Sequence, residues 1–154
     1  MQKSKHDASK KNIPLLDLNN QQKLIRKDID QAIKKVLDHG SYIMGPEVYE
    51  LELELAAFSQ TKHAIACSSG TDALLLALLA KKINVNDVVY VPSFTFSATA
   101  EVVALLNAIP IFIDVDESTF NMDFQSLHDT HNKVLAKGLN PVGVISVDMF
   151  GQPC

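Results

Sequence analysis

The chain has 154 residues, of which 47% are hydrophobic and 21% are charged, a composition that suits one globular domain with a real core. Its net charge of −4 argues against general nucleic-acid binding, which requires a basic face. The apolar runs are too short to cross a bilayer, and no secretory signal precedes them. Two cysteines, Cys67 and Cys154, make no disulfide framework. We therefore expect a cytoplasmic protein without nucleic-acid or membrane partners.

The first third of the chain predicts a tail and two helices. Residues 1–12 are polar and lysine-rich, so we expect a disordered tail, with residues 13–154 forming the folded part. Apolar residues recur at helical spacing from Leu24 to Leu37, and this helix should end near Gly40. A second helix should begin at Pro46, which suits a first helical position. Its expected inward-facing residues are Val48, Leu51, Leu55 and Phe58.

A tight turn of small residues lies between two apolar segments. Residues 63–67 are typical of a buried strand, and residues 73–80 are rich in helix formers. The first N–H groups of a helix lack intrahelical partners, and the helix dipole favours an anion beside them. Ser69-Gly70-Thr71 therefore predicts a phosphate-binding turn. The alternative is an ordinary capped helix start, since Ser, Thr and Asp are the usual capping residues.

The remaining segments alternate between strands and helices. We predict strands at 88–91, 109–116 and 142–147, and helices at 98–106 and from Asp123 to about Leu135. Apolar strands that do not alternate with polar residues indicate a mostly parallel sheet with helices on both faces, an α/β fold. Ligands bind at the carboxyl ends of such strands. The segments expected there are 69–71, 92–96, Asp114 and 148–152.

Several motifs together resemble the N-terminal part of the DegT/DnrJ/EryC1/StrS family of sugar aminotransferases, which are fold-type I enzymes dependent on pyridoxal 5′-phosphate (PLP). The resemblance covers nearly the whole chain, from Ile13 to Pro153. The matching motifs are Ile13–Leu18, Gly45–Val48, Ser69–Leu74, Val91–Ala100, Phe112–Asp116 and Phe150–Pro153. By this resemblance, residues 13–154 are the N-terminal portion of the PLP-binding large domain, and the C-terminal part is missing.

The resemblance implies a set of site residues. The PLP phosphate would lie on the backbone amides of Gly70, Thr71 and Asp72, in the turn that begins with Ser69. Phe96 would lie against the pyridine ring, a role that suits an aromatic side chain; the alternative is a core phenylalanine under a loop. Further residues implied are Thr99 and Gln152 near the cofactor, and Tyr42 and Gly45 near the substrate entrance. No metal site is expected.

No catalytic residue is expected within these residues. In the family the Schiff-base lysine and the acid that pairs with the pyridinium nitrogen lie downstream of the Gly-Gln-Pro loop, beyond Cys154. We therefore expect this fragment to be inactive by itself. Asp148 stands where many members have histidine, and we interpret it as a subfamily trait; the alternative is a solvated acid at a strand end.

The implied reaction moves an amino group from glutamate to a keto-sugar carried on a nucleotide, for amino-sugar and surface-polysaccharide biosynthesis, in a homodimeric enzyme. One alternative is a PLP-dependent sugar dehydratase of the same family, in which histidine replaces the lysine. The other is a non-catalytic domain that binds a phosphate or a nucleotide. Against this second alternative, the turn lacks the multi-glycine dinucleotide fingerprint.

Overall fold

The structure is a computed structural model that describes residues 14–154, so the expected tail at 1–12 lies outside the described residues. The chain divides into two compact units, Met1–Ala66 and Cys67–Cys154. Among the described residues, no helix combines the length and apolarity needed to cross a membrane.

The first unit contains two helices, α1 (Leu18–His39) and α2 (Pro46–Phe58). Asp17 caps α1 by accepting a hydrogen bond from the Asn20 amide at 3.1 Å. The predicted end at Gly40 is confirmed: this residue has a left-handed backbone with φ of 69°, and its N–H donates to the Val36 carbonyl at 3.0 Å. The predicted start of α2 at Pro46 is also confirmed.

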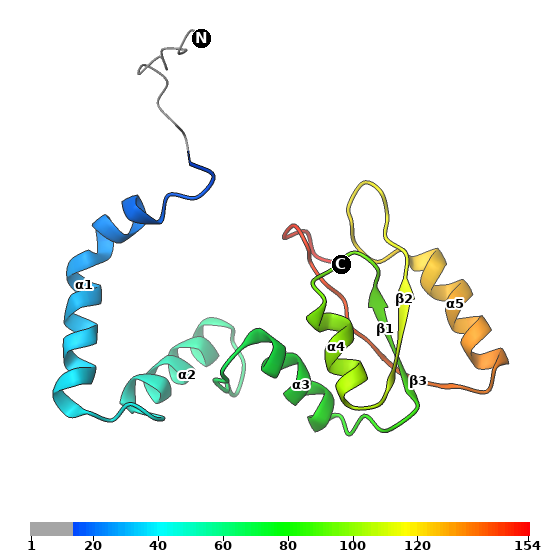
Figure 1. Ribbon diagram of the computed structural model, residues 1–154, viewed down its shortest axis with the longest axis horizontal. Coiled ribbons are helices and arrows are strands. Elements are labelled where there is room, and N and C mark those ends of the chain that lie inside the picture. Colours follow the sequence, from blue (N-terminus) through cyan, green and yellow to red (C-terminus); the bar gives the residue numbers. More distant parts are fainter. Residues whose placement is uncertain (1–13) are drawn as a thin grey trace, which may run out of the picture. The chain divides into compact units, whose positions relative to one another are not determined.

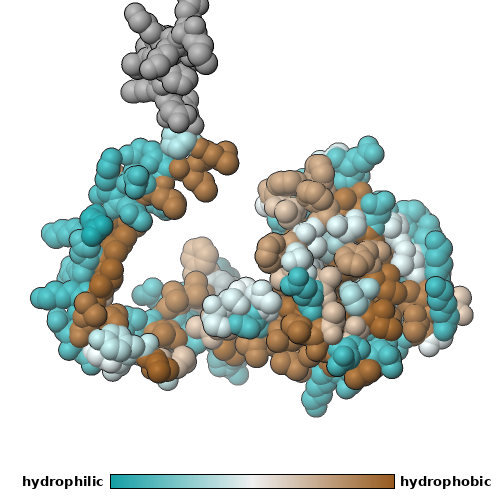
Figure 2. Space-filling model, in the orientation of Figure 1, coloured by the Kyte–Doolittle hydropathy of each residue, from teal (hydrophilic) through white to brown (hydrophobic). Residues whose placement is uncertain are grey.

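Neither α1 nor α2 buries a residue within the described part of the unit. Apolar side chains form a stripe along α1 in Figure 2. The prediction that α2 turns these side chains inward is wrong for Leu51, Leu55 and Phe58. All three are exposed, and Phe58 is 88% exposed. Helical spacing predicts which residues share a face but not that another element covers it, and no described element of this unit packs on that face.

The second unit is a three-stranded sheet with helices on both faces, which confirms the predicted α/β class. The strand order is β2-β1-β3 and both pairings are parallel. Figure 1 shows α4 and α5 on opposite sides of the strands. The elements are α3 (Gly70–Ala80), β1 (Asp87–Pro92), α4 (Ala98–Leu105), β2 (Ile109–Ile113), α5 (Phe124–Ala136) and β3 (Asn140–Val144).

Strand β1 is the centre of the core, and all six of its residues are buried. Successive side chains of a strand point to opposite faces. Val89 and Val91 accordingly pack with Val102 of α4, while Val88 and Tyr90 pack on the other face with Ile113 of β2 and Val134 of α5. Because helices cover both faces of the sheet, the sequence of this strand is a nearly continuous apolar run.

The predicted strand at residues 63–67 is wrong. This segment has no strand structure, Ile65 is 82% exposed, and Cys67 is exposed as well. A strand requires hydrogen bonds from a neighbouring backbone, and none of the three described strands pairs with this segment. The third predicted strand is displaced: β3 ends at Val144, so residues 145–147 already belong to the segment that follows it.

Candidate cofactor site

The turn before α3 is held by hydroxyl groups. Ser69 is the N-cap of α3: its backbone is extended, and its Oγ accepts a hydrogen bond from the Asp72 amide at 3.1 Å. The Asp72 carboxylate in turn accepts hydrogen bonds from the hydroxyls of Ser68 and Ser69. These bonds, first that of Ser68, hold the pKa of Asp72 below its ordinary value. The capped helix start considered from the sequence is therefore present.

Capping leaves part of this helix end open. The Asp72 amide is occupied by the cap, whereas the Gly70 and Thr71 amides have no acceptor within residues 14–154. A Cβ placed on Gly70 would meet no atom within 4 Å. An anion could therefore approach these two amides, with the dipole of an eleven-residue helix behind them.

These residues face a cavity of about 550 Å³, a size typical of small-molecule sites, which span roughly 300–1,000 Å³. Three segments meet around it: the start of α3, the loop from β1 into α4, and the segment after β3. The lining residues are Gly70, Thr71, Leu74, Thr95, Phe96, Ala98, Thr99, Ile145, Ser146, Val147, Asp148 and Met149. They converge because β1 and β3 are parallel neighbours, so their carboxyl ends meet at one edge.

Four of the predicted cofactor residues line this cavity: Gly70, Thr71, Phe96 and Thr99. Phe96 is 72% exposed, so the alternative of a core phenylalanine is wrong. Thr99 is only 4% exposed, and its Oγ1 lies 3.0 Å from Oγ1 of Thr95, four residues earlier in the loop before α4. An exposed aromatic face and a partly buried pair of hydroxyls thus border the same space.

The other predicted site residues do not line the cavity. Ser69 and Asp72 hold the turn from behind, and Gln152 is exposed, with its backbone carbonyl accepting from Asn121 Nδ2 at 3.2 Å. Tyr42 and Gly45 belong to the first unit. Tyr42 is 66% exposed, whereas Gly45 is buried, and a Cβ there would clash with the Ser41 carbonyl oxygen.

Sequence reasoning missed several lining residues. Thr95 lay in the predicted loop but its pairing with Thr99 was not anticipated; their spacing of four residues was the available signal. Ser146 was hidden because the predicted strand extended too far. Asp148, which was expected at the ligand-binding edge but not named as a cofactor residue, lies at the cavity, and its Oδ1 accepts from the Cys154 amide at 3.0 Å.

The charge of the site is unusual for an anion site. The lining contains an acid, Asp148, but no lysine or arginine among the described residues. A phosphate would therefore depend on the α3 amides, the helix dipole and the Thr71 hydroxyl. Within residues 14–154 there is also no group of three His, Cys, Asp or Glu side chains placed to hold a metal ion.

Comparison with known proteins decides the family. The sequence profile of the DegT/DnrJ/EryC1/StrS aminotransferase family matches residues 23–154. The chain belongs to this family. The turn before α3, the loop after β1 and the segment after β3 all fall within the matched residues.

Relatives in this family are sugar aminotransferases. The chain is 44% identical over 142 residues to the UDP-2-acetamido-2-deoxy-3-oxo-D-glucuronate aminotransferase of Pseudomonas aeruginosa, covering 91% of this chain and 37% of that protein. A crystal structure of a family aminotransferase from Brucella abortus superposes with a TM-score of 0.89 at 42% identity, covering 93% of this chain and 39% of that one. A Streptococcus pneumoniae protein described as a sugar aminotransferase, in its PLP form, superposes with a TM-score of 0.59 at 32% identity, covering 63% and 26%. The chain thus spans little more than a third of the P. aeruginosa relative.

Proposed function

We propose that this chain is the cofactor-holding part of a PLP-dependent aminotransferase that acts on a nucleotide-linked keto-sugar. The observation that carries the proposal is the meeting of Gly70 and Thr71 with Phe96 and Thr99 around one cavity. Two open amides at a helix start suit a phosphate, and an exposed phenylalanine face suits a flat ring. These features agree with a member of the family to which the chain belongs.

The residues fit PLP in separate roles. Gly70 and Thr71 would hold the phosphate, Phe96 would cover one face of the ring, and Ser69 would keep the turn in shape through the Asp72 amide. When bound, PLP supplies the electron sink on which transamination depends. The chain's own contribution is to hold the cofactor's phosphate and limit its rotation.

The substrate side of the proposal follows the relatives. The P. aeruginosa relative acts on a UDP-linked 3-oxo sugar, so a UDP-linked keto-sugar is the first substrate class to test. Glutamate as the amino donor and a homodimeric enzyme complete the proposal. Gln152, Tyr42 and Gly45 remain weaker candidates near the cofactor and the substrate entrance.

Cofactor binding can be tested on the chain itself. Pyridoxamine 5′-phosphate is a better probe than PLP, because its amine does not react with surface lysines. We expect it to bind more tightly than pyridoxamine and to shift the amide NMR signals of Gly70 and Thr71. Equal binding of the two compounds, or shifts confined to other residues, would contradict the proposed phosphate site.

A matched pair of variants separates the site from general charge effects. Thr71→Asp and Gln125→Asp each place a carboxylate at the second residue of a helix, in α3 and α5 respectively. The dipole favours an acid at both positions, so both variants should fold. Only Thr71→Asp should repel the phosphate and weaken binding of pyridoxamine 5′-phosphate.

The reaction itself can be tested with a chimera. This chain would replace the aligned 142 residues of the P. aeruginosa relative, and transamination between glutamate and the UDP-linked 3-oxo sugar would be measured. We expect the chimera to be active. The same chimera carrying Thr71→Asp should lose both cofactor binding and transamination. A folded chimera that binds the cofactor but does not transaminate would count against the proposed reaction.

A further inference from the structure

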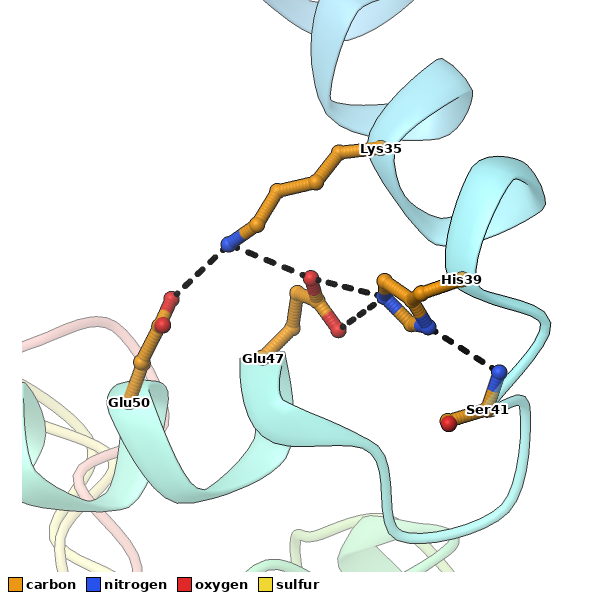
Figure 3. Close-up of polar contacts among 5 residues, drawn as sticks. All are labelled: Lys35, His39, Ser41, Glu47 and Glu50. Carbon is orange, nitrogen blue, oxygen red and sulfur yellow. Dashed lines mark hydrogen bonds and ion pairs between the residues drawn. The ribbon is translucent and has the colours of Figure 1, made fainter.

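The turn between α1 and α2 is organised around one histidine. His39 is the last residue of α1, and its side chain is 26% exposed. Its Nδ1 accepts a hydrogen bond from the Ser41 amide at 3.0 Å, and its Nε2 lies 3.1 and 3.2 Å from the two carboxylate oxygens of Glu47 (Figure 3). One imidazole ring thus contacts both the beginning of the turn and the first helical turn of α2.

The partners determine which nitrogen carries the proton. A backbone N–H can only donate, so Nδ1 must present its lone pair to Ser41. An ionised carboxylate can only accept, so Nε2 must carry the hydrogen. Both contacts are satisfied together only by a neutral imidazole protonated at Nε2. The imidazolium form has a hydrogen on Nδ1 and cannot accept from Ser41.

The groups around Glu47 keep its carboxylate ionised, so that it can accept a hydrogen bond from the ring. Lys35 of α1 lies 3.3 Å from the Glu47 carboxylate and 3.4 Å from that of Glu50, while the Glu47 carboxylate itself contacts the His39 ring (Figure 3). The pKa of Glu47 is held below its ordinary value, first by its own backbone N–H and then by His39 and Lys35. Glu47 therefore stays ionised when the ring gains its proton.

We infer that His39 stabilises the Gly40–Gly45 turn in a pH-dependent way, through its hydrogen bonds to Ser41 and Glu47. The neutral ring holds the Ser41 amide and the Glu47 carboxylate at once. Protonation removes the acceptor for Ser41 and converts the Glu47 contact into an ion pair. Acidification thus releases the start of the turn while α2 stays attached to α1. This inference concerns residues of the first unit and does not depend on the proposed function.

The first test reads the proton directly in the unmodified chain. Long-range ¹H–¹⁵N spectra of the imidazole distinguish the two neutral tautomers and the imidazolium. We expect the Nε2–H tautomer at pH 8 and the imidazolium at pH 5. A neutral ring protonated at Nδ1 at pH 8 would overturn the inference without any variant.

The second test follows the Ser41 amide by hydrogen exchange, corrected for the intrinsic effect of pH. Loss of one hydrogen bond worth about 1 kcal/mol should lower its protection roughly fivefold between pH 8 and pH 5. In His39→Asn the carboxamide oxygen can replace Nδ1 and does not titrate, so protection should persist at both pH values. In His39→Gln the amide nitrogen can reach Glu47 but Ser41 loses its acceptor, so protection should be low at both.

The control is His63→Asn, which removes an exposed histidine of the same unit. It should leave the pH response of Ser41 unchanged. Far-UV circular dichroism establishes that each variant keeps its helices. The inference is refuted if Ser41 protection in the parent is independent of pH, if His39→Asn shows the parent's pH response, or if His39→Gln retains full protection.

Discussion

The hydroxyl of Tyr90 in β1 lies 3.0 Å from Nδ1 of His131 in α5, and the two rings meet edge to face with centroids 5.9 Å apart. This pair joins the central strand to the helix that covers one face of the sheet. Burial raises the pKa of Tyr90, so its hydroxyl stays protonated well above neutral pH.

Tyr90→Phe should destabilise the second unit. The change keeps the ring but removes the partner of a half-buried imidazole nitrogen, at a cost of about 1 kcal/mol in the free energy of unfolding. Urea denaturation measures this loss. Tyr42→Phe, at an exposed position of the other unit, should change stability by less than about 0.5 kcal/mol.

Ser69→Ala should weaken the start of α3. The Asp72 amide loses its acceptor, and an N-cap replacement of this kind costs about 1 kcal/mol. Unfolding by urea and amide exchange over the first turn of α3 both report the effect. The exposed residue Ser93 offers a matched Ser→Ala control, and equal effects at the two positions would contradict the capping role.

Asp116 should make stability depend on acid. Its Oδ1 accepts from the amides of Ser118 and Thr119 at 3.0 and 2.9 Å and from their hydroxyls, and these bonds, first the Ser118 hydroxyl, lower its pKa from 3.8 to about 2. A lowered folded-state pKa stabilises above the unfolded-state value and loses that effect as the pH falls. The stability of the parent over Asp116→Asn should therefore be largest above about pH 4 and shrink towards pH 2. A gap that is equal at pH 6 and pH 2.5 would refute this assignment.

Gly45→Ala should disturb the turn between α1 and α2. Its Cβ would clash with the Ser41 carbonyl oxygen, and relieving such an overlap costs about 1–3 kcal/mol. Faster amide exchange over residues 41–48 is the expected result. Gly70→Ala is the matched control, because its Cβ enters open space, and it should leave exchange in α3 unchanged or slower.

Phe96→Ala should separate stability from cofactor binding. The side chain is 72% exposed, so its removal should change unfolding by less than about 0.5 kcal/mol. If Phe96 covers the ring, affinity for pyridoxamine 5′-phosphate should fall by roughly two- to tenfold, since an aromatic contact is worth about 0.5–1.5 kcal/mol. Phe124→Ala, also at an exposed position, should leave that affinity unchanged.

Much of the second unit could be predicted because its signals are local. The apolar run 88–91 became the buried strand β1, and Asp123 caps α5 by accepting from the Ser126 amide, as expected. The segment 63–67 has an equally apolar pattern but is not a strand. The difference is a neighbouring backbone: β1 has one on each side, and segment 63–67 has none among the described strands.

The cavity likewise combines residues that could be predicted from the sequence with residues that could not. Gly70, Thr71, Phe96 and Thr99 were recognised from motifs, and Asp148 was expected at the same strand-end edge, whereas Ser146 was placed inside a strand. The strand pattern placed Asp148 at the carboxyl edge of the sheet, but nothing near Ser146 and Asp148 in the sequence indicates which strand lies beside theirs. Their position follows from β3 pairing with β1 rather than with β2.

Local patterns were thus sufficient to predict the end of α1 at Gly40, the start of α2 at Pro46 and the buried strand β1, and the motifs along the chain indicated its family. Caps, glycine conformations and apolar runs act within a few residues, so they can be read in order along the chain. The order of the strands and the choice of segments that line one cavity were decided by folding. These depend on contacts between residues far apart in the chain, whose free energy no local pattern contains.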